Sequence, residues 1–174
     1  MSSAQPFLLV DVDGVLNAFG FPGGHEDGLG AITFEAEFES RGFPIRVPAG
    51  TRERIATLET LFDCVWATSW EHYAITHLAP ELGFGADWPV LRVWEDVPEE
   101  GSLKLPAVRR FADLPEQRSR ALAWIDDDLE PDALAWAVGR TAEGVTTLIV
   151  QPDEAVGLTA GHVDRLVAFS EECA

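Results

Sequence analysis

The sequence has few cysteines and no long hydrophobic run. Its two cysteines, Cys64 and Cys173, show neither metal-ligand spacing nor the pattern of a disulfide framework. The early apolar run at residues 7–10 is shorter than the roughly 7 to 15 residues of a secretory signal core, and no run approaches a membrane span. We therefore expect a cytoplasmic protein with no membrane partner.

Basic residues are also scarce, because 12 Lys and Arg stand against 30 Asp and Glu and give a net charge of −18. Such a surface repels nucleic acid phosphates, so we expect no extended nucleic acid binding. A phosphorylated ligand must be captured locally, and the best candidates for a basic patch are Arg41, Arg46, Arg109 and Arg110. Lysine itself occurs once, as Lys104. An ammonium is a compact, strongly hydrated point charge, so this single lysine indicates a task that a planar guanidinium performs badly.

Hydrophobic residues are plentiful, at 47% of a chain of 174 residues. That is enough to form and cover a core, which excludes disordered and fibrous classes. The length corresponds to one ordinary domain, so we expect residues 1–174 to fold as a single unit.

Short apolar runs without polar alternation, at residues 7–10, 64–67, 121–125 and 147–150, predict strands buried on both faces. Segments with helical spacing lie between them, after Thr51, after Pro106 and after the expected N-cap Thr159. This alternation predicts an α/β fold, a Rossmann-like three-layer sandwich with a mainly parallel sheet. A further strand at residues 90–94 makes the expected sheet five-stranded.

Residues 18–50 break this rhythm, because they are rich in glycine and proline around an alternating stretch at residues 32–38. The pattern predicts a small β-hairpin flap, or minimal cap, after the first strand. A hairpin of this size cannot form its own core, so we expect it to lean on the rim of the sheet.

Ligands of open parallel sheets bind beyond the carboxyl ends of the strands, so the polar residues after each run are candidate site residues. They are Asp11, Asp13 and Gly14 after the first run, Thr68 and Ser69 after the second, and Asp126 and Asp127 after the third. Lys104 stands two residues before Pro106, where a helix is expected to begin. These elements together place a hydroxyl, an ammonium and several carboxylates in one crevice.

Electrostatics indicate what this crevice holds. Carboxylates about 5 Å apart repel by roughly 3 kcal/mol per pair at an effective dielectric constant near 20, and one lysine cannot offset four of them. A divalent cation with hard oxygen ligands can, and Mg²⁺ is the usual choice where carboxylates share it with waters and a phosphate. We therefore expect Mg²⁺ as the cofactor, with Asp11, Asp13, Asp126 and Asp127 as candidate ligands.

In order along the chain, DVDGV at 11–15, Thr68 in VWATSW, Lys104 in GSLKLPAV and the acidic pair in AWIDDD resemble the motifs of haloacid dehalogenase (HAD) superfamily phosphohydrolases. The resemblance implies a phosphatase in which Asp11 is the nucleophile and Asp13 the general acid and base. It further implies that Thr68 holds phosphoryl oxygens, that Lys104 neutralises nucleophile and phosphate, and that Asp127, with Asp126 beside it, binds Mg²⁺. Val15 departs from the family pattern, which more commonly has threonine there.

The strings DVDGVLN, WATSWE, KLPAV and AWIDD more closely resemble the HAD domains associated with bacterial RNA repair proteins. This implies that the substrate is a phosphorylated small molecule, such as a nucleotide, or a nucleic acid terminus. We place Gly14, Ser69 and Trp70 beside the bound substrate. Trp70 is positioned to stack on a base, although packing in the core is the more common role of such a tryptophan.

Two non-catalytic interpretations remain open. Receiver-like phosphoacceptor modules also join carboxylates, a hydroxyl and a lysine at strand ends, but there the lysine comes last, whereas Lys104 precedes the acidic pair. The second alternative is a relative of the phosphatases that binds phosphate and Mg²⁺ without turnover.

Overall fold

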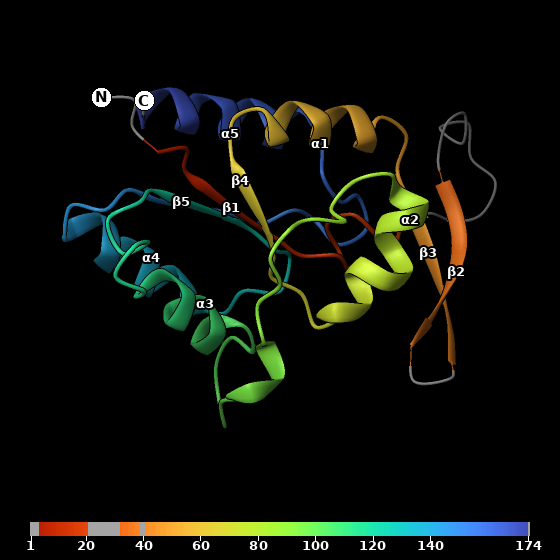
Figure 1. Cartoon of the computed structure of the whole chain (residues 1–174), viewed down its shortest axis with the longest axis horizontal. Helices are drawn as coiled ribbons and strands as arrows, with labels where there is room; N and C mark the ends of the chain where they lie inside the picture. The colour runs from red at the N-terminus through yellow and green to blue at the C-terminus, as the bar shows by residue number, and fades with distance from the viewer. Residues whose placement is uncertain (1–3, 21–31, 39–40, 174) are drawn as a thin grey trace.

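Figure 1 shows the computed structural model, which describes residues 4–20, 32–38 and 41–173. Four strands form a parallel sheet: β4 (Asp63–Trp66), β1 (Phe7–Val10), β5 (Leu122–Ile125) and β6 (Thr147–Val150), in that order across the sheet. The register pairs Val10 with Trp66 on one side and with Ile125 on the other. The carboxyl ends of the three strands β4, β1 and β5 are therefore level, and the residues that follow them meet at one edge.

Helices cover both faces of the sheet (Figure 1). The layer of α1 (Thr51–Glu59) and α5 (Ala160–Glu172) lies on one side, and the layer of α3 (Leu105–Ala112) and α4 (Pro131–Ala142) lies on the other. In β1, Leu8 and Val10 pack in the core on the side of α1 and α5, and Phe7 and Leu9 pack in the core on the side of α3 and α4. This two-sided burial explains why β1 and β5 are apolar throughout, and it confirms the predicted α/β sandwich.

Among the described residues, the main sheet has no fifth strand. Val90 makes a single parallel bridge to Trp66, and the chain then turns into η2, a short 3-10 helix at Val93–Glu95. In η2 the Trp94 backbone N–H donates to the Glu71 carboxylate at 2.9 Å and not to a strand of the sheet. The apolar residues around position 90 therefore pack without extending the sheet.

The predicted hairpin is present. Strands β2 (Ile32–Phe38) and β3 (Arg41–Val47) pair antiparallel and separately from the main sheet. Ala36, Ile45 and Val47 pack into the core on the α1 side, so the hairpin leans on the rim as expected. Residues 21–31 and 39–40 of the expected flap lie outside the described residues.

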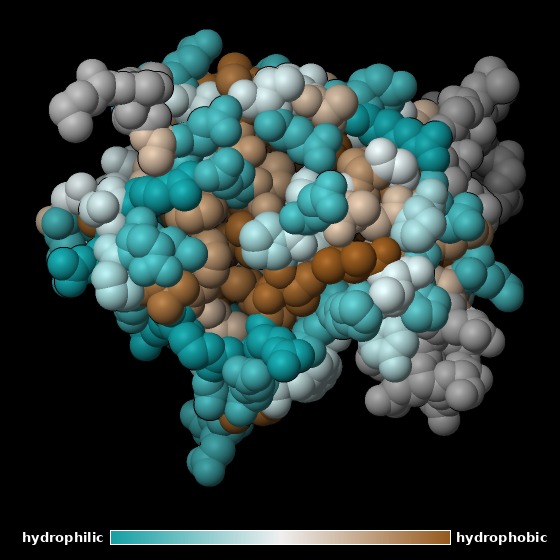
Figure 2. Space-filling model, in the orientation of Figure 1, coloured by the Kyte–Doolittle hydropathy of each residue, from teal (hydrophilic) through white to brown (hydrophobic). Residues whose placement is uncertain are grey.

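The segment between β4 and α3 contains η1 (Ala74–Leu78), a π-helical turn, which continues into α2 (Ala79–Leu82). Figure 2, in the orientation of Figure 1, shows hydrophobic residues gathered at the centre of the face turned to the viewer. They lie between the two helical layers and are bordered by hydrophilic residues. Within the described part of the chain, no helix combines the length and the apolar character that crossing a membrane requires.

A glycine substitution tests the packing of the segment beside β4. Gly85 has a φ of +79°, and a Cβ there would overlap the indole of Trp66, which also donates its N–H to the Gly85 carbonyl at 2.8 Å. We expect Gly85→Ala to lower the free energy of unfolding by about 2–4 kcal/mol, from backbone strain plus overpacking. Denaturant unfolding measures this change.

Gly144→Ala is the matched control, because Gly144 has a φ of +93° with no atom within 4 Å of the added Cβ. This variant introduces the backbone strain of a positive φ without the steric overlap with Trp66. Equal losses in the two variants would show that the contact with Trp66 contributes nothing.

Candidate active site

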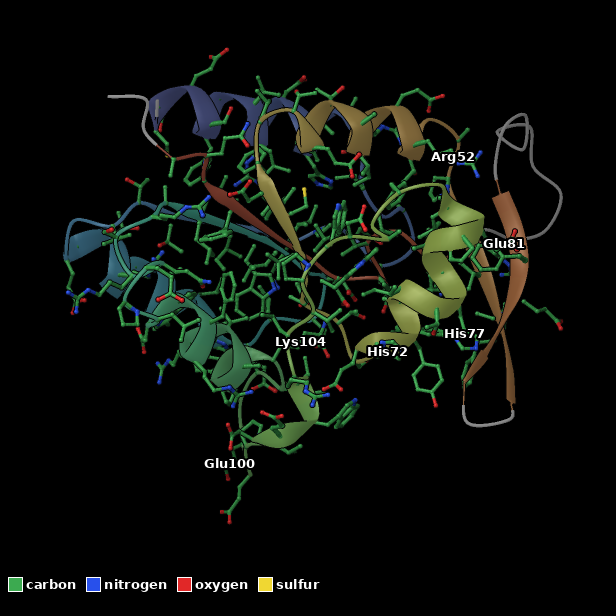
Figure 3. The ribbon with its side chains drawn as sticks, in the orientation of Figure 1. Arg52, His72, His77, Glu81, Glu100 and Lys104 are labelled. Carbon is green, nitrogen blue, oxygen red and sulfur yellow. The ribbon has the colours of Figure 1, made fainter. Side chains whose placement is uncertain are left out.

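An ammonium between two carboxylates lies at the level carboxyl ends of the strands. Lys104 Nζ donates to Asp11 Oδ2 and, at 2.8 Å, to Asp126 Oδ2. Asp11 directly follows β1, Asp126 directly follows β5, and Lys104 is the N-cap residue of α3. Figure 3 shows Lys104 near the middle of the molecule. The structure thus brings together three of the residues that the sequence singled out.

Burial dominates the electrostatics of this group. Burial raises the pKa of Asp11, although Lys104 acts in the opposite direction. Burial and the nearby Asp11 carboxylate raise the pKa of Asp126 to about 8. Burial alone would lower the pKa of Lys104, but Asp11 and Asp126 raise it above its ordinary value. Lys104 is therefore charged at neutral pH, but its charge does not offset the effect of burial on the two carboxyls.

A divalent cation fits this group. Oxygen atoms of Asp11, Asp126 and Asp127 lie within 4.8 Å of one another. Asp11 Oδ1 is buried and has no hydrogen-bond partner among the described residues. A buried carboxylate oxygen without a partner is costly, and a hard cation is the partner that carboxylate oxygens favour. The donor set therefore suits Mg²⁺.

The two adjacent aspartates have different surroundings. Asp126 is fully buried, and its oxygens accept hydrogen bonds from Lys104, from Trp124 Nε1 at 3.1 Å and from the Asp128 N–H at 3.1 Å. Asp127 is half-buried and lines the neighbouring cavity, and burial and Asp11 raise its pKa to about 6. Asp126 therefore positions the lysine, and Asp127 has the oxygens exposed to a ligand.

Gly14 has a role that the sequence did not suggest. Its φ is +67°, and a Cβ there would overlap the carboxylate of Asp127. The turn after β1 and the turn after β5 are in contact at this point, so only glycine leaves room for Asp127. Gly14 accordingly shapes the acidic group, and it does not line the adjoining cavity.

Asp13 lies outside the group of three carboxylates. Its Oδ1 accepts from Asn17 Nδ2 at 2.9 Å, and its Oδ2 accepts from Trp70 Nε1 at 2.8 Å. Asn17 was missed in the sequence, although its place four residues after Asp13 in a turn is a usable signal. Trp70 is buried in the core and also orients Asp13, so its packing role is confirmed.

The hydroxyls after β4 also differ in their surroundings. Thr68 is fully buried, and its hydroxyl accepts a hydrogen bond from the Trp70 N–H at 3.3 Å. Ser69 is half-buried and lines the cavity beside the carboxylates. Of these two hydroxyl residues, Ser69 lines the cavity and Thr68 does not.

The loop before Lys104 is anchored to the start of α4, by residues that the sequence did not single out. Asp132 accepts from the Ser102 hydroxyl at 2.7 Å and from the Ser102 N–H at 3.2 Å, and Ser102 Oγ accepts from the Glu130 N–H at 2.9 Å. Some desolvation opposes it, but these hydrogen bonds lower the pKa of Asp132 below its ordinary value. The anchor fixes the position from which Lys104 reaches between the strands.

A cavity of about 470 Å³ opens over the group, and Asp11, Asp13, Ser69, Lys104 and Asp127 contribute to its lining. Its rim includes the exposed carboxylates of Asp128 and Glu154. Of the expected basic patch, Arg110 pairs with Glu95, at the end of η2, and with Asp96, which follows it. An acidic rim disfavours ligands that carry many phosphates.

No family model matches the chain, and no curated protein sequence matches it.

The acidic group makes Mg²⁺ binding testable without any assay of activity. We expect Mg²⁺ at about 100 times its dissociation constant to stabilise the fold by about 2.7 kcal/mol, which raises the thermal midpoint by several degrees. Asp127→Asn should remove most of this shift. Asp164→Asn makes the same change on the exposed face of α5 and should leave it intact. A full Mg²⁺ shift in Asp127→Asn would rule out Asp127 as a ligand.

Proposed function

We propose that the chain is a Mg²⁺-dependent phosphatase that hydrolyses phosphate monoesters through an aspartyl-phosphate intermediate. The observation that carries the proposal is the Lys104 ammonium held between Asp11 and Asp126 at the base of a cavity. The motif order that resembles HAD phosphohydrolases supports the same assignment of roles. Phosphoryl transfer depends chiefly on positioning and charge stabilisation, and both are provided by groups at the carboxyl ends of the strands.

Asp11 is the proposed nucleophile. It is buried beside Lys104, whose positive charge lowers the repulsion between the attacking carboxylate and the phosphoryl oxygens. Mg²⁺, when bound, supplies further positive charge that masks the phosphate. The Asp11 carboxylate forms a bond to phosphorus as the ester P–O bond breaks.

Asp13 is the proposed general acid and base. In its protonated form it gives a proton to the leaving oxygen, which departs as an alcohol. As a carboxylate it then takes a proton from water, whose oxygen attacks phosphorus and breaks the bond to Asp11. Inorganic phosphate is released, and Asp13 regains its proton. Trp70 and Asn17 hold its two oxygens in place, and each oxygen retains a lone pair for this transfer.

Ser69 and Lys104 complete the proposed phosphate site. Both line the cavity with Asp11, so the Ser69 hydroxyl can donate to a phosphoryl oxygen opposite the ammonium. Thr68, which the resemblance implies as the phosphate-binding hydroxyl, would support this turn from within through its hydrogen bond to the Trp70 N–H.

The nucleophile is tested with Asp11→Asn. The amide lacks the carboxylate charge and cannot form the aspartyl-phosphate, so we expect phosphate release from 4-nitrophenyl phosphate to fall to background.

Wild-type activity should depend on Mg²⁺, stop with EDTA and return when Mg²⁺ is added. A protein that binds Mg²⁺ but releases no phosphate would favour the non-catalytic binding module. Activity of Asp11→Asn near that of the wild type would exclude the mechanism.

The lysine is tested with Lys104→Arg, which retains the charge. Lys104 is almost completely buried between two carboxylates, and a planar guanidinium is too large to take the place of its Nζ. We expect kcat to fall by roughly 100-fold, in the range typical for the loss of one preorganised hydrogen-bond donor. The reverse exchange Arg118→Lys, in the exposed turn after α3, is the control and should leave kcat unchanged. Unimpaired turnover by Lys104→Arg would show that charge alone suffices.

A further inference from the structure

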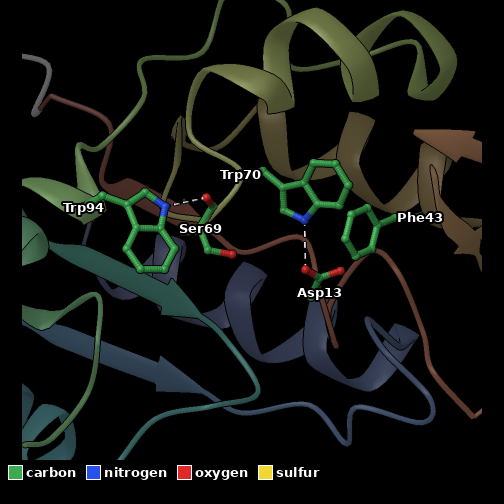
Figure 4. Close-up of a pocket in the computed structure, with 5 residues that line it drawn as sticks. All are labelled: Asp13, Phe43, Ser69, Trp70 and Trp94. Carbon is green, nitrogen blue, oxygen red and sulfur yellow. Dashed lines mark hydrogen bonds between the residues drawn. The ribbon is translucent and has the colours of Figure 1, made fainter. Parts of the chain in front are cut away.

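A second cavity, the aromatic slot, adjoins the proposed phosphate site. It has a volume of about 160 Å³ and is lined by Asp13, Phe43, Ser69, Trp70 and Trp94. Figure 4 shows Trp94 and Phe43 on either side, with Ser69, Trp70 and Asp13 between them. The aromatic residues come from three separate segments: β3, the turn after β4, and η2.

Trp94 is exposed yet held in place. Trp94 is 52% exposed. Its indole N–H donates to the Ser69 carbonyl at 2.9 Å, and its backbone N–H donates to the Glu71 carboxylate. A large apolar surface that is fixed by two hydrogen bonds and left open to solvent is typical of a binding site. The ring is thus preorganised as one wall of the slot.

Phe43 forms the opposite wall. It is 39% exposed and meets Trp70 edge-on, with ring centroids 6.0 Å apart and planes inclined by 78°. Phe43 lies on β3 of the hairpin, so the flap contributes directly to this cavity. Aromatic walls of this kind favour a flat ring, because stacking is available to any planar π-system.

The slot and the phosphate site share Asp13 and Ser69. Asp13 is the residue that protonates the leaving oxygen in the proposed mechanism, so the group attached to that oxygen lies at the mouth of the slot. The slot is therefore placed to receive the leaving group of the ester.

We propose that the aromatic slot binds the planar base of a nucleoside monophosphate, whose phosphate occupies the site beside Asp11. This inference rests on the proposed phosphatase function. The apolar walls provide little for the hydroxyls of a plain sugar phosphate. The acidic rim at Asp128 and Glu154 and the net charge of −18 oppose the further phosphates of an oligonucleotide.

The test compares adenosine 5′-monophosphate with ribose 5-phosphate, in which an anomeric hydroxyl replaces the base. We expect kcat/KM to be roughly tenfold higher for the nucleotide, as stacking of one base provides. 4-Nitrophenyl phosphate reports the contribution of a bare aromatic ring, and a 5′-phosphorylated oligonucleotide reports the effect of added phosphates. Equal values for the nucleotide and the sugar phosphate would overturn the proposal, as would a preference for the oligonucleotide.

Variants locate the preference in the slot. Phe43→Leu should raise KM for the nucleotide several-fold and leave the values for ribose 5-phosphate unchanged. Trp94→Leu also removes the indole hydrogen bond to the Ser69 carbonyl, so its readout is the ratio of kcat/KM for the two substrates, which should fall several-fold toward equality. Tyr73→Leu removes another exposed aromatic ring that lines neither cavity, and it should change neither substrate. A preference that survives in both slot variants, with thermal midpoints like that of the wild type, would place the base elsewhere.

Binding measurements separate this inference from the proposed function. Calorimetry with Asp11→Asn gives the same comparison of nucleotide and sugar phosphate without turnover. Tighter binding of the nucleotide, together with no phosphate release by the wild type, would support the slot and reject the phosphatase. Phosphate release without any preference for the nucleotide would support the phosphatase and reject the slot.

Discussion

The contact between Lys104 and the carboxylates of Asp11 and Asp126 is the interaction on which the rest of the site depends. The register of β1 and β5 brings these two buried carboxylates together, and they repel one another. The ammonium offsets part of this repulsion, and it ties the first turn of α3 to the carboxyl edge of the sheet. A buried ion pair contributes little net stability in most proteins, so positioning is the better explanation for this arrangement.

This contact also determines how the neighbouring turns are used. Asp126 already accepts hydrogen bonds from Lys104, Trp124 and the Asp128 N–H, whereas Asp127 faces the cavity. Asp127 finds room there only because Gly14 has no side chain. The different roles of these two adjacent carboxylates thus follow from burial and hydrogen bonding, which give chemically identical groups different surroundings.

The motifs were sufficient to select Asp11, Lys104, Asp126 and Asp127, because level strand ends in a parallel sheet place such residues at one edge. They did not show that Thr68 is buried while Ser69 lines the cavity, or that Asn17 and Trp70 hold Asp13. They also did not reveal the slot, since Phe43 and Trp94 are more than 50 positions apart in sequence and belong to no motif. The expected fifth strand is a similar case, because Trp94 donates hydrogen bonds to Glu71 and Ser69, residues more than 20 positions away, and not to a neighbouring strand.

The amino-acid sequence by itself determined the class of fold, the positions of the four strands to within a residue, and the hairpin between the first strand and the first helix. It could do so because burial on both faces and helical spacing are local patterns. Only the tertiary structure decided which carboxylate pairs with the lysine, which carboxylate faces the cavity, and which aromatic rings border it. Those outcomes depend on the register between strands and on contacts between residues far apart in the chain, and no local pattern encodes them.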